Sequence, residues 1–316
     1  MIGLDDAFGV RAASLRELQN TLMTSFAGAG YEEVIPPLAE RPDSLNRGAG
    51  SFLADETLMF SDPADAGLLA IRPDITPQIA RIAATRLRDD AVLRLSYSGP
   101  VMLARPDSLR GSRQQWQTGI EFLGVAGAEA DIEVMHLAAM AMHQAGFSHP
   151  VLLVGHLGLL EALVADSGAD LEAWAAVLRR QSLEDMQHML SCSDLPDAHA
   201  EALLAMAAGR ADASWLQQAS GLPSSFHQSA DDLLHLVEQV GERLRGEVSV
   251  RADASVMPRF LYHSGIVFAG FAPNAAQALL HGGRYDRMMA LHGRDMPATG
   301  LTCDLWSWLD ALPAKS

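Results

Sequence analysis

The sequence predicts an α+β fold in which an antiparallel sheet is flanked by helices and interrupted by an all-helical insertion. Strand-like segments occur in two groups, one in the first half of the chain and one near its C-terminus, with amphipathic helices beside them. Between the groups, residues 157–244 contain only Ala- and Leu-rich helical runs with short polar breaks. We therefore expect one domain built from residues 1–156 and 246–316, with residues 157–245 inserted into it.

Four apolar residues recur at helical spacing near the N-terminus and predict the first helix: Leu15, Leu18, Leu22 and Phe26. Gly28 and Gly30 would end this helix. Three short strands are then expected, at residues 31–35, 58–60 and 69–72.

Two further helices are predicted before the insertion. Thr76 is a favourable N-cap residue and Pro77 suits the first helical position, so we expect a helix over residues 77–88. Acidic residues open a second helix, which is expected over residues 131–146. Within the insertion, the clearest helix covers residues 171–180, and it has two arginines at its C-terminus.

Longer strands are predicted at residues 92–98 and 115–123, joined by a loop rich in Gly, Pro and Arg at residues 99–112. Strand character returns beyond the insertion, at residues 247–251, 259–269, 275–281 and 299–303. Gly282-Gly283 is expected to form a turn before a short helix over residues 284–291.

The strand at residues 115–123 carries a polar face suited to binding a small molecule. Gln117 and Glu121 lie on this face with Gly119 between them, which places an amide, a gap and a carboxylate on one surface. Glycine inside a strand often marks a close approach to the sheet. A ligand with an amino or imidazole N–H would suit the carboxylate. The alternative is a solvent-facing strand in which the glycine has no binding role.

The charge balance argues against nucleic-acid binding. The chain has 23 Lys and Arg against 39 Asp and Glu, which gives a formal net charge of −16 and a pI of about 5.0. Such a chain would repel a phosphate backbone. Lys315 is the only lysine in the sequence, so we expect no catalytic or phosphate-binding lysine.

Neither a metal, another cofactor nor a membrane is expected as a partner. Cys192 and Cys303 lack the spacing of a metal or redox motif. The N-terminus lacks the pattern of a secretion signal, and the most apolar stretch, residues 150–165, is too short to span a bilayer. We therefore expect a cytoplasmic protein.

Five segments resemble, in sequential order, the catalytic domain of histidyl-tRNA synthetases, which has the class II synthetase fold. They are residues 31–38, Arg72-Pro-Asp-Ile-Thr76, Gln117-Thr-Gly-Ile-Glu121, residues 261–268 and Gly282-Gly-Arg-Tyr-Asp286. Together they span nearly the whole chain. The first segment looks like the class II motif at the dimer interface, so the resemblance implies a dimer.

The resemblance also implies a histidine-binding site, in which Glu121 and His263 would face the imidazole. Five further residues would hold the amino acid moiety or line the pocket: Asp74, Thr76 and Gln117, and then Tyr262 and Tyr285. An ammonium group pairs well with a carboxylate, and an imidazole N–H needs an acceptor, so these roles are chemically reasonable. A lone histidine such as His263 is otherwise more often structural than a ligand.

The arginines with which these synthetases hold ATP are replaced in this sequence. Leu103 stands at the position of the first, although a shift of register would bring in Arg105. Ser307 stands at the position of the second. Asp304 replaces a glycine nearby, and its carboxylate would repel a triphosphate.

Three arginines near these motifs remain candidates for binding anions: Arg105, Arg113 and Arg259. Arg259 lies one position after Pro258, which aligns with a further synthetase arginine. The chain also ends about where an anticodon-binding domain would begin, so we expect no such domain.

This combination resembles the histidyl-tRNA synthetase paralogs that serve as regulatory subunits of short-form ATP phosphoribosyltransferase in histidine biosynthesis. The runs beginning at Gly99 and His263, and the segment around Arg113, are more similar to these paralogs than to the synthetases. The resemblance implies a non-catalytic homodimer within a larger hetero-oligomer. It would activate a separate catalytic subunit and mediate feedback by histidine as the effector.

Three alternatives remain open at this stage. The chain could be a free-standing ligase that adenylates histidine, with Arg105 and Arg113 serving the phosphates, which histidine-dependent pyrophosphate exchange would reveal. It could be a histidine sensor with another partner. It could also be an interaction scaffold with a decayed pocket, and calorimetry with histidine separates these last two.

Overall fold

The computed structural model describes residues 3–47, 55–105, 112–244, 248–258, 261–273, 275 and 277–312. The strands of its large sheet are β1 (Glu32–Glu33), β5 (Leu93–Met102), β6 (Gln114–Leu123), β7 (Val151–His156), β8 (Ser249–Ala252), β9 (Ile266–Phe271), β10 (Leu280–Arg284) and β11 (Ala298–Asp304). A small sheet contains β2 (Ala39–Glu40), β3 (Leu58–Ser61) and β4 (Leu68–Ile71).

The helices fall into two groups along the chain. Those that belong with the sheets are α1 (Gly9–Gly28), α2 (Pro42–Leu45), α4 (Thr76–Thr85), α5 (Ala128–Ala145), α12 (Asp286–Leu291) and α13 (Leu305–Ala311). Those between β7 and β8 are α6 (Leu157–Val164), α7 (Leu171–Arg180), α8 (Leu183–Ser191), α9 (Asp197–Ala207), α10 (Ala213–Gln218) and α11 (Ser224–Arg243). We call this second group, α6 to α11, the helical block.

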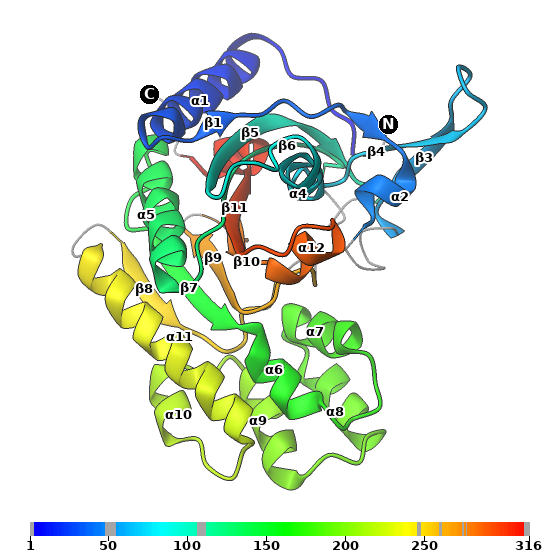
Figure 1. Ribbon diagram of the computed structural model, residues 1–316. Helices are drawn as coiled ribbons and strands as arrows, with labels where there is room; N and C mark the ends of the chain where they lie inside the picture. Colours follow the sequence, from blue (N-terminus) through cyan, green and yellow to red (C-terminus); the bar gives the residue numbers. More distant parts are fainter. Residues whose placement is uncertain are drawn as a thin grey trace.

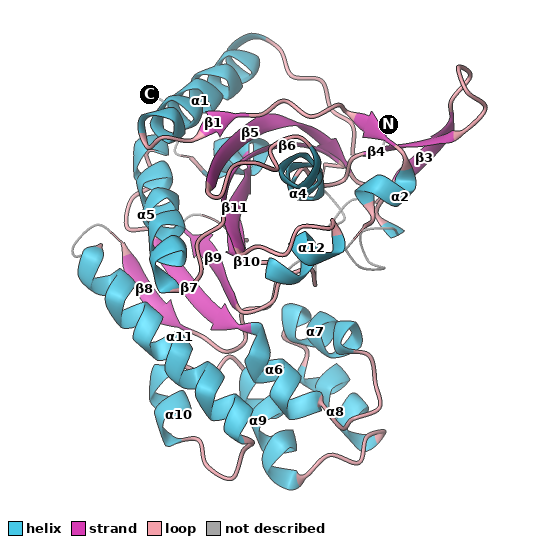
Figure 2. Ribbon diagram, viewed as in Figure 1, coloured by secondary structure: helices cyan, strands magenta, loops and turns pink. Residues whose placement is uncertain are grey.

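The large sheet has the strand order β1-β5-β6-β11-β10-β9-β7-β8, and the small sheet β2-β4-β3 projects beside it (Figures 1 and 2). The outer pairs β1–β5 and β7–β8 are parallel, whereas the pairs between them are antiparallel. Antiparallel strands therefore dominate the centre, as the sequence predicts.

The large sheet separates two hydrophobic cores. On one face, α1, α5, α11 and α13 pack around residues such as Phe26, Met142 and Trp308. On the other face, α4 and α12 enclose a smaller core that includes Ile79 and Tyr97. Among the helices described, none combines the length and the hydropathy that a membrane-spanning segment requires.

The helical block is tied to the sheet through α11. Because β7 and β8 are parallel neighbours, the chain must return along the sheet before β8 can begin. Helix α11 makes this return and packs against β7, β8 and α5, while α6 to α10 extend beyond the sheet (Figure 1). Its buried residues Phe226, Ala230, Leu233 and Val240 recur at helical spacing on one face.

Several predicted boundaries are wrong because tertiary contacts override local sequence signals. Strand β5 continues through Pro100 to Met102 instead of ending at residue 98, because it stays paired with β6. Gly282-Gly283 lies inside β10 rather than in a turn. A Cβ atom on Gly282 would lie 2.2 Å from the Phe268 ring, so this glycine permits close packing between strands. Strands β9 and β10 also begin later than expected.

Candidate ligand-binding site

A cavity of about 130 Å³ opens on the face of the large sheet that carries the smaller core. Strands β6, β10 and β11 contribute to it, and residues 256–258 form part of a facing wall. Six residues of the predicted histidine site line it: Thr76, Gln117, Glu121, Tyr262, His263 and Tyr285. The seventh, Asp74, lies behind Tyr262, so the structure brings the predicted set together.

Glu121 is the most deeply placed acidic group of the cavity, with 1% of its surface exposed. The hydroxyl of Tyr285 donates to its Oε2 at 2.7 Å, and the hydroxyl of Tyr97 donates to its Oε1 at 3.2 Å. Burial raises its pKa from 4.5 to about 8, although the hydrogen bonds act in the opposite direction. The ligand-free carboxyl therefore holds a proton at neutral pH.

Two glycines make room for this carboxyl. A Cβ on Gly119 would lie 2.5 Å from the Tyr97 hydroxyl, and one on Gly300 would lie 1.7 Å from Glu121 Oε2. The gap that the sequence places beside Gly119 is thus filled by Tyr97 from the paired strand β5. Sequence reasoning missed Tyr97 as a site residue. The sequence signal that could have identified Tyr97 is an aromatic residue in one predicted strand that can pair with Gly119 in the next.

Asp74 stands two residues before α4 and is almost fully buried. Its Oδ2 accepts a hydrogen bond from the Tyr262 hydroxyl at 3.0 Å, and its Oδ1 accepts one from the backbone N–H of Thr76 at 3.3 Å. Burial is the main cause that raises its pKa above the ordinary value. The N–H of Ile75 donates to Gln117 Oε1 at 3.0 Å, which binds β6 to this helix start.

The expectation that Thr76 is the N-cap of the helix is wrong. Helix α4 begins at Thr76 itself, and Pro77 occupies the second position. The carboxylate of Asp74 accepts from the Thr76 N–H, so Asp74 satisfies the helix start that a capping hydroxyl would otherwise serve. The aspartate therefore fixes α4 as well as facing the cavity wall.

Aromatic rings form one side of the cavity. Tyr262 and His263 stack with ring centroids 4.5 Å apart and an interplanar angle of 20°. Tyr262 also meets Tyr285 edge to face at 6.0 Å. Because Tyr262 contacts Asp74 and Tyr285 contacts Glu121, the aromatic side positions both acidic groups.

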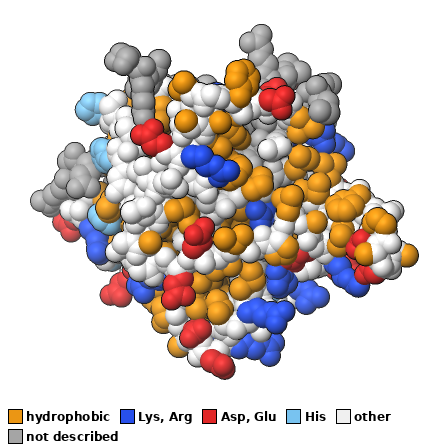
Figure 3. Space-filling model, turned by 90° about the horizontal axis from the view of Figure 1, so that it is seen from above, with side chains coloured by type: hydrophobic (Ala, Val, Ile, Leu, Met, Phe, Trp, Pro, Cys, Tyr) orange, Lys and Arg blue, Asp and Glu red, His pale blue; other side chains and the backbone are white. Residues whose placement is uncertain are grey.

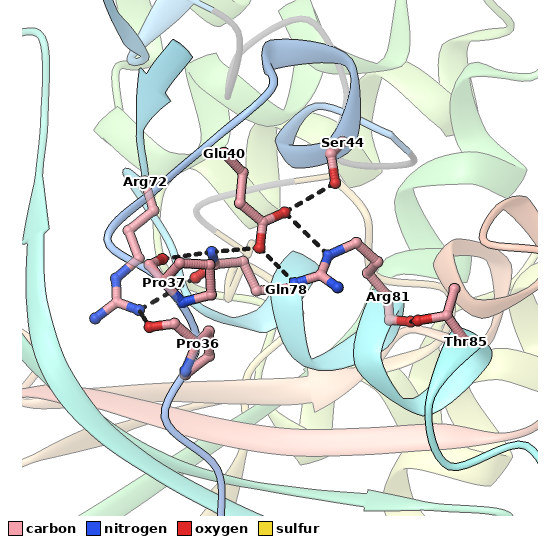
Figure 4. A network of polar contacts seen from close by, with 8 residues as sticks. All are labelled: Pro36, Pro37, Glu40, Ser44, Arg72, Gln78, Arg81 and Thr85. Carbon is pink, nitrogen blue, oxygen red and sulfur yellow. Dashed lines mark hydrogen bonds and ion pairs between the residues drawn. The ribbon is translucent and has the colours of Figure 1, made fainter. Parts of the chain in front are cut away.

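A buried arginine links the segments that lead into α4, the helix that begins at Thr76. The Arg72 side chain donates to the carbonyl oxygen of Pro36 at 3.0 Å and to Gln78 Oε1 at 3.2 Å (Figure 4). It also donates to the carbonyl oxygen of Pro100 at 2.9 Å. A Cβ on Gly99 would lie 2.5 Å from its Nη2, so glycine is needed for the guanidinium to fit. Arg72 therefore joins β4 to β5 and to α4.

Glu40 extends this network to the small sheet (Figure 4). Its carboxylate accepts hydrogen bonds from Gln78 Nε2 and Ser44 Oγ, both at 2.9 Å. Both Nε and Nη2 of Arg81 also donate to it, and the side chains of this ion pair are only 10% and 25% exposed. The network holds β2, α2 and α4 in a fixed relation.

Asp304 and Ser307, which stand where the resemblance places ATP-binding residues, lie at the other end of the cavity. Asp304 caps α13: its carboxylate accepts from the N–H groups of Trp306 and Ser307 at 3.3 and 3.2 Å, and from Ser307 Oγ at 2.7 Å. It also accepts from the Trp116 N–H at 2.9 Å. Asp304 and Ser307 both line the cavity. An acidic helix cap thus stands where the resemblance places ATP.

Two of the three candidate anion-binding arginines, Arg105 and Arg113, are described by the structure, and neither lines the cavity. Arg105 is exposed, and Arg113 donates from Nε to the carbonyl of Leu103 at 3.1 Å. Arg259 lies outside the described residues. Leu103 is fully buried and cannot serve as a polar ligand. Within the part of the chain that the structure describes, no Arg or Lys lines the cavity.

Comparison with known proteins gives consistent sequence matches. The chain matches the family described as histidyl-tRNA synthetase over residues 3–307. Three relatives are named ATP phosphoribosyltransferase regulatory subunit. That of Marinomonas sp. (strain MWYL1) is 33% identical over 312 residues, covering 96% of this chain and 79% of the relative. Those of Thioalkalivibrio sulfidiphilus and Burkholderia pseudomallei (strain K96243) are 35% and 37% identical, covering 96% and 95% of this chain and 78% of each relative.

Solved structures confirm the class II synthetase-like fold. The regulatory subunit/histidyl-tRNA synthetase of Bacillus halodurans superposes with a TM-score of 0.85 at 24% identity, covering 99% of this chain and 82% of that chain. The histidyl-tRNA synthetase of Nostoc sp. PCC 7120 gives 0.80 at 15% identity, covering 98% and 73%. The ATP phosphoribosyl transferase complex of Thermotoga maritima gives 0.68 at 17% identity, covering 91% and 96%.

Replacing Glu121 with glutamine should change how stability depends on pH. Because folding raises the pKa of Glu121 from 4.5 to about 8, the folded protein retains a proton that the unfolded chain releases between these values. This residue therefore makes the free energy of unfolding fall as pH rises through that window. Glu121→Gln cannot ionise, so we expect a shallower decline between pH 5 and pH 8 in urea unfolding without ligand.

The control is Glu201→Gln, at an exposed position on α9. This variant should keep the pH dependence of the unsubstituted protein. Equal slopes for Glu121→Gln and the control would contradict the assignment of a protonated carboxyl.

Proposed function

Because this chain belongs to the family of ATP phosphoribosyltransferase regulatory subunits, a branch of the histidyl-tRNA synthetase family, we propose that it binds a separate catalytic transferase chain and controls its activity. The chain is a regulatory subunit and not itself the catalytic enzyme. The observation that carries the proposal is 33–37% identity with relatives of that name over 95–96% of the chain. The fold shared with the Thermotoga maritima transferase complex is consistent with it.

The chemistry of the cavity favours regulation over amino-acid adenylation. Adenylation requires cations around the transferring phosphates. The described lining carries Asp304 and Ser307 at that end and no arginine. The carboxylate of Asp304 would repel a triphosphate. We therefore expect no histidine-dependent pyrophosphate exchange.

Histidine is the effector that the cavity fits best. Its imidazole N–H would donate to Glu121, and its ammonium group would lie by Thr76 and Gln117, close to the carboxyl group of Asp74. Both acidic groups are buried among tyrosines, and a cationic ligand would supply a charge partner. Histidine could alter the transferase only by binding two states of the assembly with different affinity, typically by about 1–3 kcal/mol.

An exposed hydrophobic surface supports a homodimer within the larger assembly. Five large apolar side chains on β3, β4 and the segment after β1 are 42–81% exposed: Ile35, Leu38, Met59, Phe60 and Leu68. Hydrophobic side chains gather on the side of the molecule where the β3–β4 hairpin projects (Figure 3). Exposed apolar side chains gathered on one side of a molecule are typical of a protein interface, so we propose this side as the face where two copies meet.

Mixing the chain with a short-form catalytic subunit tests the main proposal. With ATP and phosphoribosyl pyrophosphate, this chain alone should transfer nothing. Added to the catalytic subunit, it should change the rate about fivefold or more and make that rate sensitive to histidine. An unchanged rate together with an unchanged inhibition curve would refute the proposal.

Calorimetric titration with histidine tests the effector site. Glu121→Ala should weaken binding about 10- to 100-fold, because the imidazole N–H loses its buried acceptor. Glu201→Ala, which removes an exposed carboxylate from α9, should leave the dissociation constant unchanged. Equal binding by both variants would place histidine elsewhere.

Sedimentation of charged variants tests the dimer. Met59→Asp places a charge on a residue that is 58% exposed within the apolar surface, and it should shift the protein to the monomer. Leu183→Asp is the matched control, because Leu183 is 44% exposed on α8 in the helical block. If Met59→Asp remains as dimeric as the control, another surface mediates the association.

A further inference from the structure

One wall of the cavity is held by the helical block as well as by the sheet. We call residues 253–258 the wall loop, because Val256, Met257 and Pro258 line the cavity. The N–H of Ala254 donates to the carbonyl of Ala211, between α9 and α10, at 2.9 Å. Arg179 of α7 donates from Nη1 to the carbonyl of Pro258 at 2.9 Å. The block therefore contacts both ends of the wall loop.

Internal hydrogen bonds and contact with the sheet give the wall loop a defined conformation, so it can move as a unit when its contacts with the helical block move. The N–H and hydroxyl of Ser255 both donate to Asp253 Oδ1, at 2.9 and 2.6 Å. Ala254 and Ser255 are almost fully buried. A Cβ on Gly155 of β7 would lie 2.7 Å from the Val256 carbonyl oxygen, so the loop lies directly on the sheet. Movement of its anchors would consequently move residues 256–258 as a unit.

Arg179 is suited to position this loop. Its Nη2 donates to Glu172 Oε1 at 2.6 Å within the same helix, while Nη1 holds the Pro258 carbonyl. The side chains of this pair are only 20% and 22% exposed. A planar guanidinium with two partners has a defined orientation, so α7 and Pro258 keep a fixed relation.

Two further contacts join the block to the segments that carry the aromatic side of the cavity. The N–H of Leu157, at the start of α6, donates to the carbonyl of Gly265 at 2.9 Å, two residues after His263. Arg287 pairs with Glu161 of α6 at 2.6 Å, two residues after Tyr285. The wall loop, the Tyr262–His263 segment and the start of α12 are thus all attached to one body.

We propose that Arg179 is a positioning residue through which the helical block and the effector cavity are coupled. It does not line the cavity but holds the Pro258 carbonyl of the wall loop, so the placement of the block governs effector affinity. By reciprocity, occupancy of the cavity fixes the block. This inference rests on histidine as the ligand of the cavity, and it names the block as the element that responds to histidine.

Calorimetry with histidine on the full chain tests the coupling. Arg179→Ala should raise the dissociation constant about tenfold, within the range typical of coupled sites. Arg179→Lys retains a charge but has a single donor head, so its dissociation constant should be intermediate. Arg180→Ala is the matched control, because Arg180 is the next residue, is 58% exposed and pairs with Asp185 rather than with the wall loop.

Amide hydrogen exchange separates coupling from a merely structural role. Histidine should slow amide exchange in both the wall loop and α7 of the unsubstituted chain. In Arg179→Ala, histidine should still slow exchange in the wall loop but should no longer slow it in α7. If Arg179→Ala is folded and binds histidine as tightly as Arg180→Ala, the inference is overturned. If Arg179→Ala does not fold, the same comparison between Arg179→Lys and Arg180→Ala decides the question. A complete lack of histidine binding by the unsubstituted chain would refute the effector proposal, and this inference with it.

Discussion

A carboxyl group buried in the middle of a β-sheet sets the form of the cavity. An isolated charge at the place of Glu121 would be costly, and the structure meets that cost with two tyrosine hydroxyls and a retained proton rather than with a described cation. Gly119 leaves space for the Tyr97 hydroxyl, and Gly300 leaves space for the Glu121 carboxyl itself. Asp74 repeats the arrangement with Tyr262. The cavity is therefore built for a partner that brings hydrogen-bond donors or positive charge.

The same sheet carries a second constraint at its other end. Asp304 satisfies the first N–H groups of α13 and one N–H of β6, so it is part of the scaffold as well as of the cavity lining. A glycine at position 304 would remove these bonds and leave the helix start uncapped. The class II synthetase-like fold does not by itself fix the chemistry of the cavity, so function has to be argued from the site.

Much of this organisation could be predicted from the sequence, because amphipathic periodicity and ordered motifs are local signals. Helix α7 is predicted at its observed bounds, and the alternation in β6 places Gln117 and Glu121 on one face. What could not be predicted depends on pairing between distant segments. Tyr97 joins the site only because β5 places it opposite Gly119. The sequence predicts a turn at Gly282, because the Phe268 ring that packs against this glycine is apparent only in the structure. Arg179 and Pro258, which are joined by a hydrogen bond at the cavity wall, are 79 positions apart in the sequence.

The path of the chain between β7 and β8 has a consequence for how this architecture can be cut or exchanged. Helix α11 belongs to the helical block in sequence, yet it covers the outer strands of the sheet and helps to enclose the main core. Excising residues 157–245 as a cassette would uncover apolar side chains on β7 and β8, and the remainder would be prone to aggregation. A shortened or chimeric version would have to retain α11 and rejoin the chain ahead of Ser224, and without α6 and α7 it would lose their contacts with α11 and with the cavity.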